Sequence, residues 1–371
     1  MRKHLSLAIT LITLGSLNVS GQTLADSIYQ QNQKILKILE SSSVSTQIFL
    51  GYRYFMEGND HFNEFAVKRG YITFQKSLNN HISGRITPDL TVDQEGDGEG
   101  DLEMRLKYCY MELKDDGNYW IFSNPRIVVG EVFTPWIDFE EKINSFRVVG
   151  SQFMDKTTIV SSADFGFTTT ALLGGMVNKT YQNQVSKAYP GKYGSLAFGV
   201  YNGGGYHALE KNNNKVLQWR LSIRPLPEVL TGLQLTYTGA HGKGNTDLYP
   251  TWNLNAGILS YEHRYFTLTG QYFKGIGNHT GEFADINGKS YDVSGYSTFA
   301  EIKFFNKKFS LFGRYDYMNT DKVTDKVKSI QQIIGISYHI YGRNQIVLDF
   351  NRNTKADKTV DVVELMIELA L

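Results

Sequence analysis

The stretch VLQWRLSIR, residues 216–224, alternates between apolar and polar side chains from Leu217 onward. Leu217, Trp219, Leu221 and Ile223 occupy every second position, and two arginines lie among the residues between them, Arg220 and Arg224. Because successive side chains of a β-strand point to opposite faces, this pattern predicts a strand with one apolar and one wet face. Guanidinium groups are too costly to seal unpaired in a dry core, so water must reach the second face.

The same two-residue period recurs along the chain, at 48–54, 81–87, 309–317 and 363–371. The apolar stripes are about ten residues long, the length that a tilted strand needs to cross a bilayer. A β-sandwich or β-helix with one wet face would also alternate, but its sealed core could not hold the Arg, Asp and Glu found in mid-strand. The pattern therefore favours an all-β fold, a closed antiparallel transmembrane β-barrel.

Composition agrees with an exported membrane barrel. The chain has 23 Tyr, 22 Phe and 35 Gly but 7 Pro, and aromatic residues gather near strand ends, where the girdles of outer-membrane barrels meet the membrane surface. With 38 basic and 37 acidic residues it has no basic excess for binding nucleic acid. Cys109 is the single cysteine, so no intrachain disulfide can form.

The N-terminus predicts export. A short basic start (Arg2, Lys3, His4) is followed by a mostly apolar run and then by small residues, the order of a secretory signal peptide. We expect residues 1–21 to be this signal, with cleavage as late as residue 25 as the alternative.

A helix is expected next. Ile28, Ile35, Leu36 and Leu39 recur at helical spacing, which predicts a periplasmic helical segment at 22–43 before a barrel at 44–371.

The links between strands decide the strand count. Short turns and longer polar or Gly-rich links, such as 57–63, 89–101 and 354–359, alternate as expected for periplasmic turns and external loops. If 134–163 is one long loop, the count is 16 strands with both barrel ends periplasmic, and 177–192 becomes an unusually long periplasmic link. If 146–153 is instead a separate spanning strand, the short turn at Pro225 falls on the outside. Eighteen strands is the alternative count.

Three motifs resemble one family. VGEVFTPW at 129–136, GVYNG at 199–203 and RLSIRP at 220–225 are similar to strand ends and turns of the phosphate-selective porin O and P family of outer-membrane porins. The resemblance implies a 16-stranded channel, usually a homotrimer, with a long loop folded into the pore, here 134–163. It also implies anions such as phosphate as solutes.

Alternation assigns charged residues to the inner face. The pore-lining bases are expected to be Arg53, Arg69, Arg85, Arg105, Lys107, Arg220, Arg224, Lys303 and Arg314, and the inner acids Glu103, Glu301, Asp316, Asp349, Glu364 and Glu368. Lys68 competes with Arg69 for the inward face. The excess of bases predicts a weak anion preference; the alternative is that these charges pair between strands and only hydrate the wall.

The long loop supplies the constriction candidates, Asp138, Glu140, Glu141, Lys142 and Arg147. Acids slightly outnumber bases in this loop, which weakens the expectation of an anion filter there.

One segment alternates acids with other residues, mostly glycine: Asp93, Glu95, Asp97, Glu99 and Asp101. Oxygen ligands at this spacing could hold Ca²⁺, although a solvated surface loop is the more common role of such a run. No cofactor is expected.

The sequence thus predicts a porin in the outer membrane of a Gram-negative bacterium, surrounded by outer-membrane lipid and allowing passive diffusion of small hydrophilic solutes or anions. Two other classes stay open: a closed barrel with adhesive or binding loops, and a barrel hydrolase. The hydrolase is the less favoured, because the eight His are scattered and none lies in a nucleophile elbow or at a zinc-binding spacing.

Overall fold

The computed structural model describes residues 21–93, 98–322 and 326–371. The chain divides into two units, Met1–Ser43 and Val44–Leu371, which are described separately. The predicted signal peptide falls, except for its last residue, outside the described residues. Helix α1 (Gly21–Ser41) makes up the described part of the first unit, with Ile28, Leu36 and Leu39 exposed. None of the described helices has the length and hydropathy needed to cross a bilayer.

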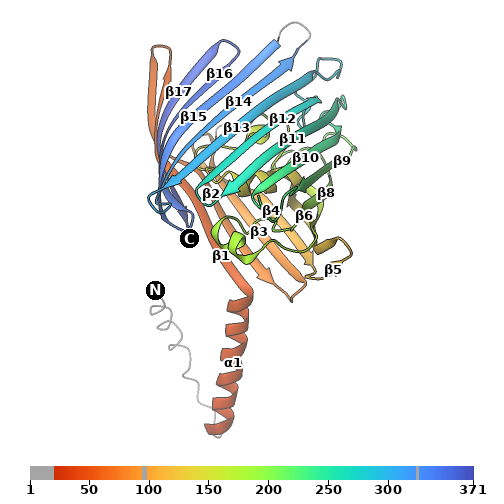
Figure 1. Ribbon diagram of the computed structural model, residues 1–371, viewed down its shortest axis with the longest axis vertical. Coiled ribbons are helices and arrows are strands. Elements are labelled where there is room, and N and C mark those ends of the chain that lie inside the picture. The colour runs from red at the N-terminus through yellow and green to blue at the C-terminus, as the bar shows by residue number, and fades with distance from the viewer. Residues whose placement is uncertain (1–20, 94–97, 323–325) are drawn as a thin grey trace. The chain divides into compact units, whose positions relative to one another are not determined.

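The second unit is a closed antiparallel barrel of sixteen long strands (Figure 1). Closure is made by β1, which pairs with β17 from Gln47 opposite Ala370 to Met56 opposite Asp361 and also pairs with β2. A two-residue strand, β5 (Asn118–Tyr119), pairs antiparallel with one end of β6. The sixteen long strands are β1 (Ser42–Glu57), β2 (Asp60–Ser77), β3 (Ile82–Val92), β4 (Leu102–Lys114), β6 (Phe122–Phe133), β7 (Ala163–Leu173), β8 (Gly194–Tyr201), β9 (Val216–Ile223), β10 (Leu233–Lys243), β11 (Thr251–His263), β12 (Phe266–Ile276), β13 (Asp292–Phe304), β14 (Phe309–Asp321), β15 (Lys326–Tyr341), β16 (Asn344–Lys355) and β17 (Lys358–Ala370).

The links separate the barrel into two ends. The turn end carries the short links, such as 264–265 and 342–343, together with 174–193, which contains α4 (Lys179–Gln184). The loop end carries 93–101, 134–162, 202–215, 244–250 and 277–291. Two links expected to be long loops are instead tight: β1 and β2 continue to residues 57 and 60, and β16 and β17 to 355 and 358, because their alternation runs on beyond the apolar stripe.

Residues 134–162, which we call the inner segment, form no strand, so sixteen is the strand count and not eighteen. The segment contains α2 (Pro135–Ile143) and α3 (Phe153–Lys156). Pro135 starts α2, where its missing N–H costs no hydrogen bond. Thr134 closes the base of the segment, since its backbone N–H donates to Ser162 O (3.2 Å) and its hydroxyl to Ser161 O (2.8 Å).

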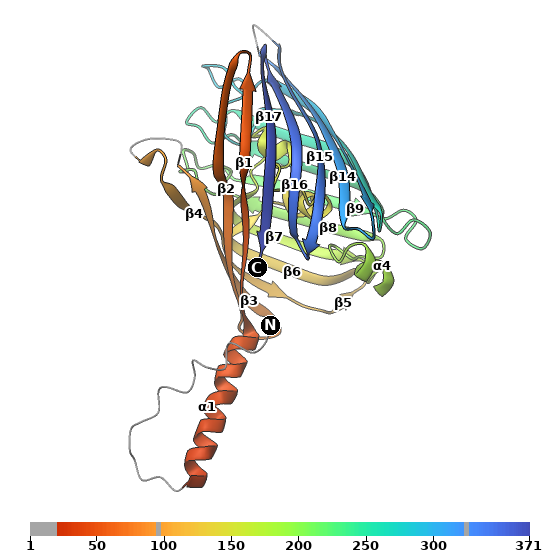
Figure 2. The same cartoon turned by 90° about the vertical axis from the view of Figure 1, so that its left-hand side faces the viewer.

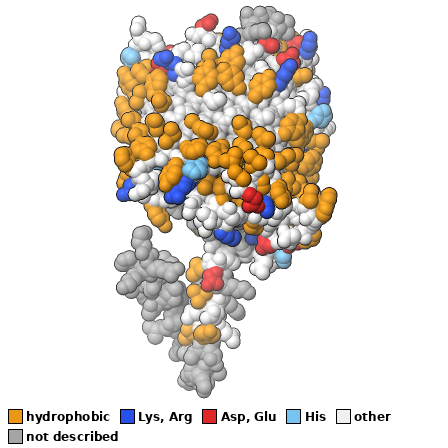
Figure 3. Space-filling model, in the orientation of Figure 1, with side chains coloured by type: hydrophobic (Ala, Val, Ile, Leu, Met, Phe, Trp, Pro, Cys, Tyr) orange, Lys and Arg blue, Asp and Glu red, His pale blue; other side chains and the backbone are white. Residues whose placement is uncertain are grey.

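The outer surface of the barrel is apolar between two aromatic rows. Tyr272, Tyr296 and Tyr317 lie opposite one another on β12–β14, and Phe304, Phe309 and Tyr338 form a second row nearer the turn end. On β14 the two rows are eight residues apart, about 27 Å along the strand or roughly 20 Å along the barrel axis at a ~40° tilt. Leu311, Ile334 and Leu348 are exposed between them. Figure 3 shows hydrophobic side chains spread over the visible face of the barrel, a band of the height that a bilayer core requires.

The inner surface is not uniformly wet, as alternation had suggested. The inner segment packs on two apolar patches of the wall: Trp136, Ile137, Phe153, Met154 and Ile159 cluster with inward side chains of β9–β14. Phe146, Val148 and Val149 cluster with those of β1, β2 and β13–β17. Figure 2 shows the helices of the segment behind β14–β17, inside the barrel. The inner segment therefore leans on β9–β17, and the wall from β1 to β4 stays largely uncovered.

Candidate solute passage

Two cavities lie along the inner face of β1–β4. The turn-end cavity, about 550 Å³, is bounded by β1–β4 and the inner segment, and reaches Arg343 and Leu371 at the turn end. The loop-end cavity, about 640 Å³, is bounded by β1–β4 and by His207 of the link 202–215. The two cavities share no lining residue, but each is lined by neighbours of the other's residues, Tyr71 beside Arg69 and Lys107 beside Arg105.

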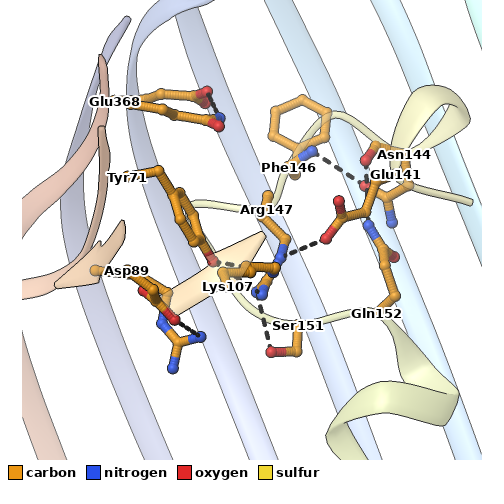
Figure 4. Close-up of polar contacts among 12 residues, drawn as sticks. Tyr71, Asp89, Lys107, Glu141, Asn144, Phe146, Arg147, Ser151, Gln152 and Glu368 are labelled. Carbon is orange, nitrogen blue, oxygen red and sulfur yellow. Dashed lines mark hydrogen bonds and ion pairs between the residues drawn. The ribbon is translucent and has the colours of Figure 1, made fainter. Parts of the chain in front are cut away.

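Seven side chains meet where the cavities adjoin, and we call this group the cavity junction. Figure 4 shows Tyr71, Asp89, Lys107, Glu141 and Arg147 of this group. Arg147 joins the inner segment to the wall: its Nε donates to Glu141 Oε1 (2.9 Å), its Nη1 to Ser151 Oγ (2.9 Å) and its Nη2 to the hydroxyl of Tyr71 (3.4 Å). The Lys107 ammonium lies 3.5 Å from the same hydroxyl. The junction consists of Arg69, Tyr71, Asp89, Lys107, Glu141, Arg147 and Tyr206.

The loop-end side of the junction is formed by one of the links at the loop end of the barrel. Tyr206, from 202–215, reaches the wall and donates its hydroxyl to Asp89 Oδ2 (3.2 Å). Arg69 Nη1 donates to the same carboxylate oxygen (3.1 Å) and to the Tyr206 oxygen (3.3 Å). Lys107 lies 5.8 Å from the Tyr206 ring centroid, a cation–π distance.

A local irregularity brings Lys107 and Tyr108 to the same side. Thr87 lies opposite Tyr108, but Pro88 lies opposite Leu106, so Lys107 is the extra residue of a bulge. Proline removes a ladder hydrogen bond and is tolerated at such bulges. As a result Lys107 and Tyr108 both line the turn-end cavity, and Arg85 stacks 4.7 Å over the Tyr108 ring.

The charges of the inner segment at the junction stay ionised. Burial opposes ionisation of Glu141, but Lys107 and Arg147 more than offset it, and the pKa of this carboxyl is lowered. Burial likewise disfavours the charged Arg147, yet Tyr71 and Glu141 leave its pKa above the ordinary value. The junction therefore holds fixed charge of both signs at neutral pH.

The remaining constriction candidates lie on two different faces of α2. Asp138 accepts a hydrogen bond from the Tyr189 hydroxyl and lies 3.7 Å from Lys142, and both Asp138 and Lys142 line the turn-end cavity. Glu140 points the other way: it is buried, and its Oε2 has no hydrogen-bond partner among the described residues. Burial raises the pKa of Glu140 to about 7. Glu140 is thus not a lining residue, which corrects its placement in the constriction.

The loop-end cavity is lined by paired bases. Arg53 Nε and Lys68 Nζ both donate to the buried Glu364 (2.7 and 2.9 Å), and Arg105 pairs with Glu103. Lys68 and Arg69 both line this cavity, so strict alternation breaks between them and neither excludes the other.

Three predicted pore-lining arginines have another role. Arg220 is sealed beneath α2, where it donates to Pro135 O (3.1 Å), Ser195 Oγ (3.0 Å) and Ser222 Oγ (2.6 Å). Arg224 holds the link 174–193 through Gly191 O (3.1 Å) and Tyr189 O (3.4 Å). Both are 1% exposed. The prediction that they line the pore is therefore corrected: they fasten chain segments to the wall.

Arg314 is the third such residue. Its guanidinium forms a bidentate pair with Asp316, from Nε to Oδ1 (3.0 Å) and from Nη2 to Oδ2 (2.5 Å), and its Nη1 donates to Ser151 O of the inner segment (2.8 Å). It lines neither of the two large cavities. Arg314 fixes the inner segment to β14 instead of facing solutes.

The acidic segment at 93–101 gives no metal site among the residues that can be described. Glu95 and Asp97 lie outside them, while Asp93, Glu99 and Asp101 lie within them. Over the described ranges no three His, Cys, Asp or Glu side chains are grouped to hold a metal ion.

Comparisons with solved structures test the fold. The outer-membrane channel DcaP of Acinetobacter baumannii aligns with a TM-score of 0.59 at 10% identity, over 89% of this chain and 97% of that one. An anion-selective porin from Comamonas acidovorans gives 0.58 at 11%, over 89% and 100%. This barrel has the porin fold. The trimer form of OmpT from Vibrio cholerae also aligns, with a TM-score of 0.53 at 9% identity, over 89% and 100%.

The porin fold is all that these likenesses establish, because the identities are low. No protein-family model matches the chain, and no curated protein sequence matches it. The resemblance of the three motifs to the phosphate-selective family thus agrees with the porin fold, while membership in that narrower family stays a proposal.

Three residues of the cavity junction were missed by sequence reasoning: Tyr71, Asp89 and Tyr206. Pro88 was a usable signal for Asp89, because a proline inside a strand pattern marks a bulge next to it. Tyr206 carried no signal, since its position depends on how the link 202–215 folds back.

Proposed function

We propose that this porin-fold barrel is an outer-membrane channel of a Gram-negative bacterium, through which small hydrophilic solutes diffuse passively with a preference for anions. The solutes pass between the inner segment and β1–β4. The observation that carries the proposal is Lys107, a 3% exposed ammonium at the cavity junction. No carboxylate of a described residue lies within ion-pair distance of it.

The charge balance of the two cavities supports an anion preference. Nine bases line them: Arg85, Lys107, Lys142, Arg147 and Arg343, and Arg53, Lys68, Arg69 and Arg105. Seven acids oppose these bases, four from the lining (Asp138, Glu141, Glu64, Glu103) and three that pair from the wall (Asp89, Glu364, Glu368). Arg85 and Lys107 are the two bases without a carboxylate partner in the described chain. A fixed positive excess lowers the electrostatic cost for anions and raises it for cations.

The narrower proposals follow from this one. Phosphate is a candidate solute, as the resemblance implies, and the anion-selective Comamonas porin shares the fold. We also propose a homotrimer, as in the trimer form of Vibrio OmpT, with surrounding outer-membrane lipid against the apolar outer band. Sedimentation of the detergent-solubilised protein tests the trimer separately from the channel.

Planar-bilayer recording tests the function. Purified protein should give discrete conductance steps and an anion-selective reversal potential in a KCl gradient. One unit charge at ~5 Å in a water-like medium is worth about 0.8 kcal/mol, favourable for an anion and unfavourable for a cation, so Lys107→Gln should lower the anion-to-cation permeability ratio about 15-fold. Lys274→Gln, on the exposed outer face of β12, is the matched control and should leave the ratio unchanged.

Other outcomes of the bilayer recording would change the proposed function. Steps without anion preference would make the channel a general one and the inner charges a hydrated wall. Absence of steps in correctly folded protein would overturn the channel and favour a closed barrel with binding loops, or a barrel hydrolase. If the steps are anion-selective, inorganic phosphate added to one side tests the solute. It should reduce the chloride current of a phosphate-preferring channel and leave that of a general anion channel unchanged.

A further inference from the structure

A third cavity branches from the turn-end cavity and belongs to neither side of the junction. Its volume is about 330 Å³, and it shares Arg85, Asp138 and Lys142 with the turn-end cavity. Its other wall is the link 174–193, which contributes Lys187, Ala188, Tyr189 and Pro190. We call it the side pocket. Its size falls at the lower end of the ~300–1,000 Å³ typical of small-molecule sites.

The side pocket is basic. Arg85, Arg126, Lys142 and Lys187 line it, against the single lining acid Asp138. Asp138 is already engaged by the Tyr189 hydroxyl and Lys142, and Arg126 pairs with Glu112. Among described residues, Arg85 and Lys187 have no carboxylate within ion-pair distance. Two positive charges therefore face this space without compensation.

Most of the rest of the lining is apolar or aromatic. Phe133, Ala171, Leu172, Ala188 and Pro190 line the cavity together with the rings of Tyr110 and Tyr189, and Asn124 and Thr170 are the two neutral polar residues. Both walls of the loop-end cavity, by contrast, are made mainly of charged side chains. A bare inorganic anion would leave this apolar surface wet, whereas an anion with a planar hydrocarbon body would cover it.

The pocket is built before any ligand arrives. Arg224 holds the link 174–193 through Gly191 O and Tyr189 O, and the Tyr189 hydroxyl donates to Asp138 on α2. The guanidinium of Arg220 covers the other side of the Tyr189 ring, 4.4 Å from its centroid. A site whose walls are fixed in this way binds without an ordering cost for the protein.

We propose that the side pocket binds a small aromatic carboxylate, with its carboxylate between Lys187 and the guanidinium groups of Arg85 and Arg126, and its ring against Phe133 and Leu172. This site is separate from the cavity junction, so a ligand there occupies the turn end without filling the passage between the two cavities. The inference goes beyond the proposed channel function and concerns equilibrium binding.

Isothermal titration of the full-length protein in detergent tests it, with benzoate as probe. Benzoate should bind more tightly than acetate, which lacks the ring, and than benzyl alcohol, which lacks the charge. Lys187→Gln removes an unpaired charge from the exposed link and should weaken benzoate binding at least fivefold. Ala188→Asp, which adds a negative charge to the lining, should weaken it further, and Lys179→Gln, on α4 outside the pocket, should not change it.

Equal benzoate affinity in wild-type and Lys187→Gln protein of unchanged circular dichroism would overturn the proposal, as would acetate binding as tightly as benzoate. The channel proposal is judged by the bilayer permeability ratio and Lys107→Gln. Loss of one result with retention of the other therefore shows which of the two ideas has failed.

Discussion

Lys68 and Glu364 form a buried ion pair that also holds the inner segment. The Lys68 ammonium lies 2.9 and 3.1 Å from the two carboxylate oxygens of Glu364 and donates to Val149 O at 2.5 Å. A single side chain of β2 thus joins β17 to the backbone of the inner segment. Removing one partner of such a pair is costly, because the other charge is left buried.

Lys68→Gln should therefore loosen the inner segment. Glu364 would keep Arg53 as its partner, so the barrel should still fold, but Val149 would lose a charge-assisted hydrogen bond. We expect single-channel current noise to increase at least twofold with little change in mean conductance. Lys243→Gln, on β10, serves as the control, and unchanged noise in Lys68→Gln would show that Lys68 does not restrain the segment.

Arg220→Gln should reduce stability without changing selectivity. The substitution removes the hydrogen bond from Arg220 to Pro135 O that joins α2 to the wall, and those that hold the guanidinium against Ser195 and Ser222 of β8 and β9, each worth about 1–3 kcal/mol when buried. The temperature at which the folded form converts to the unfolded form, followed as bands on a gel, should fall. The permeability ratio per open channel should match wild type, and a marked drop in it would return Arg220 to the pore lining.

Glu140 makes the packing of α2 depend on pH. Its carboxyl has a folded-state pKa of about 7 because of burial, against 4.5 in its ordinary state. The protonated form is the one that the packed segment favours, so this contribution is complete below pH ~4.5 and is lost as the pH rises through about 7, to the extent of about 3 kcal/mol. In Glu140→Gln the contribution no longer varies with pH.

Trypsin cleavage after Lys142, Arg147 and Lys156 measures this dependence. Wild-type protein should be cleaved faster at pH 8 than at pH 5, after correction for trypsin activity on a peptide. Glu140→Gln should be more resistant than wild type at pH 8 and equal to it at pH 5. Equal cleavage of the two proteins at pH 8 would contradict a raised pKa of the buried Glu140 carboxyl.

His207 should add a positive charge to the loop-end cavity only at acidic pH. Burial, with Arg105 and Arg69 nearby, lowers the pKa of His207 below its ordinary value of 6.5, so it is neutral at pH 7. The anion preference of wild type and His207→Gln should coincide between pH 7 and 8. Below pH 6 the wild-type reversal potential should become the more anion-selective of the two, and parallel curves down to pH 4 would exclude this histidine.

Much of the barrel could be predicted from the sequence because a transmembrane strand must satisfy a simple rule, apolar outward at every second residue. That rule, together with the alternation of short and long links, predicted sixteen strands and inward bases on β1–β4. It could not distinguish an inward side chain in water from one covered by protein. Arg220 and Arg85 follow the same alternation, yet one is sealed under α2 and the other lines the turn-end cavity.

The cavity junction was harder to predict for a related reason. It depends on a bulge at Lys107, on an exception to alternation between Lys68 and Arg69, and on a tyrosine delivered by a distant link. Each is a departure from periodicity, so a periodic argument cannot find it. Pro88 was the one local sign of such a departure.

The inner segment packs mainly against β9–β17 and leaves most of β1–β4 uncovered. This asymmetry makes the barrel suitable for engineering. Most side chains that line the two cavities come from one continuous piece of the chain, residues 45–108. Those that hold the inner segment in place come mainly from elsewhere. Replacing inward residues of that one piece can retune which molecules a nanopore sensor built on this barrel admits, provided Lys68 is kept as the fastening.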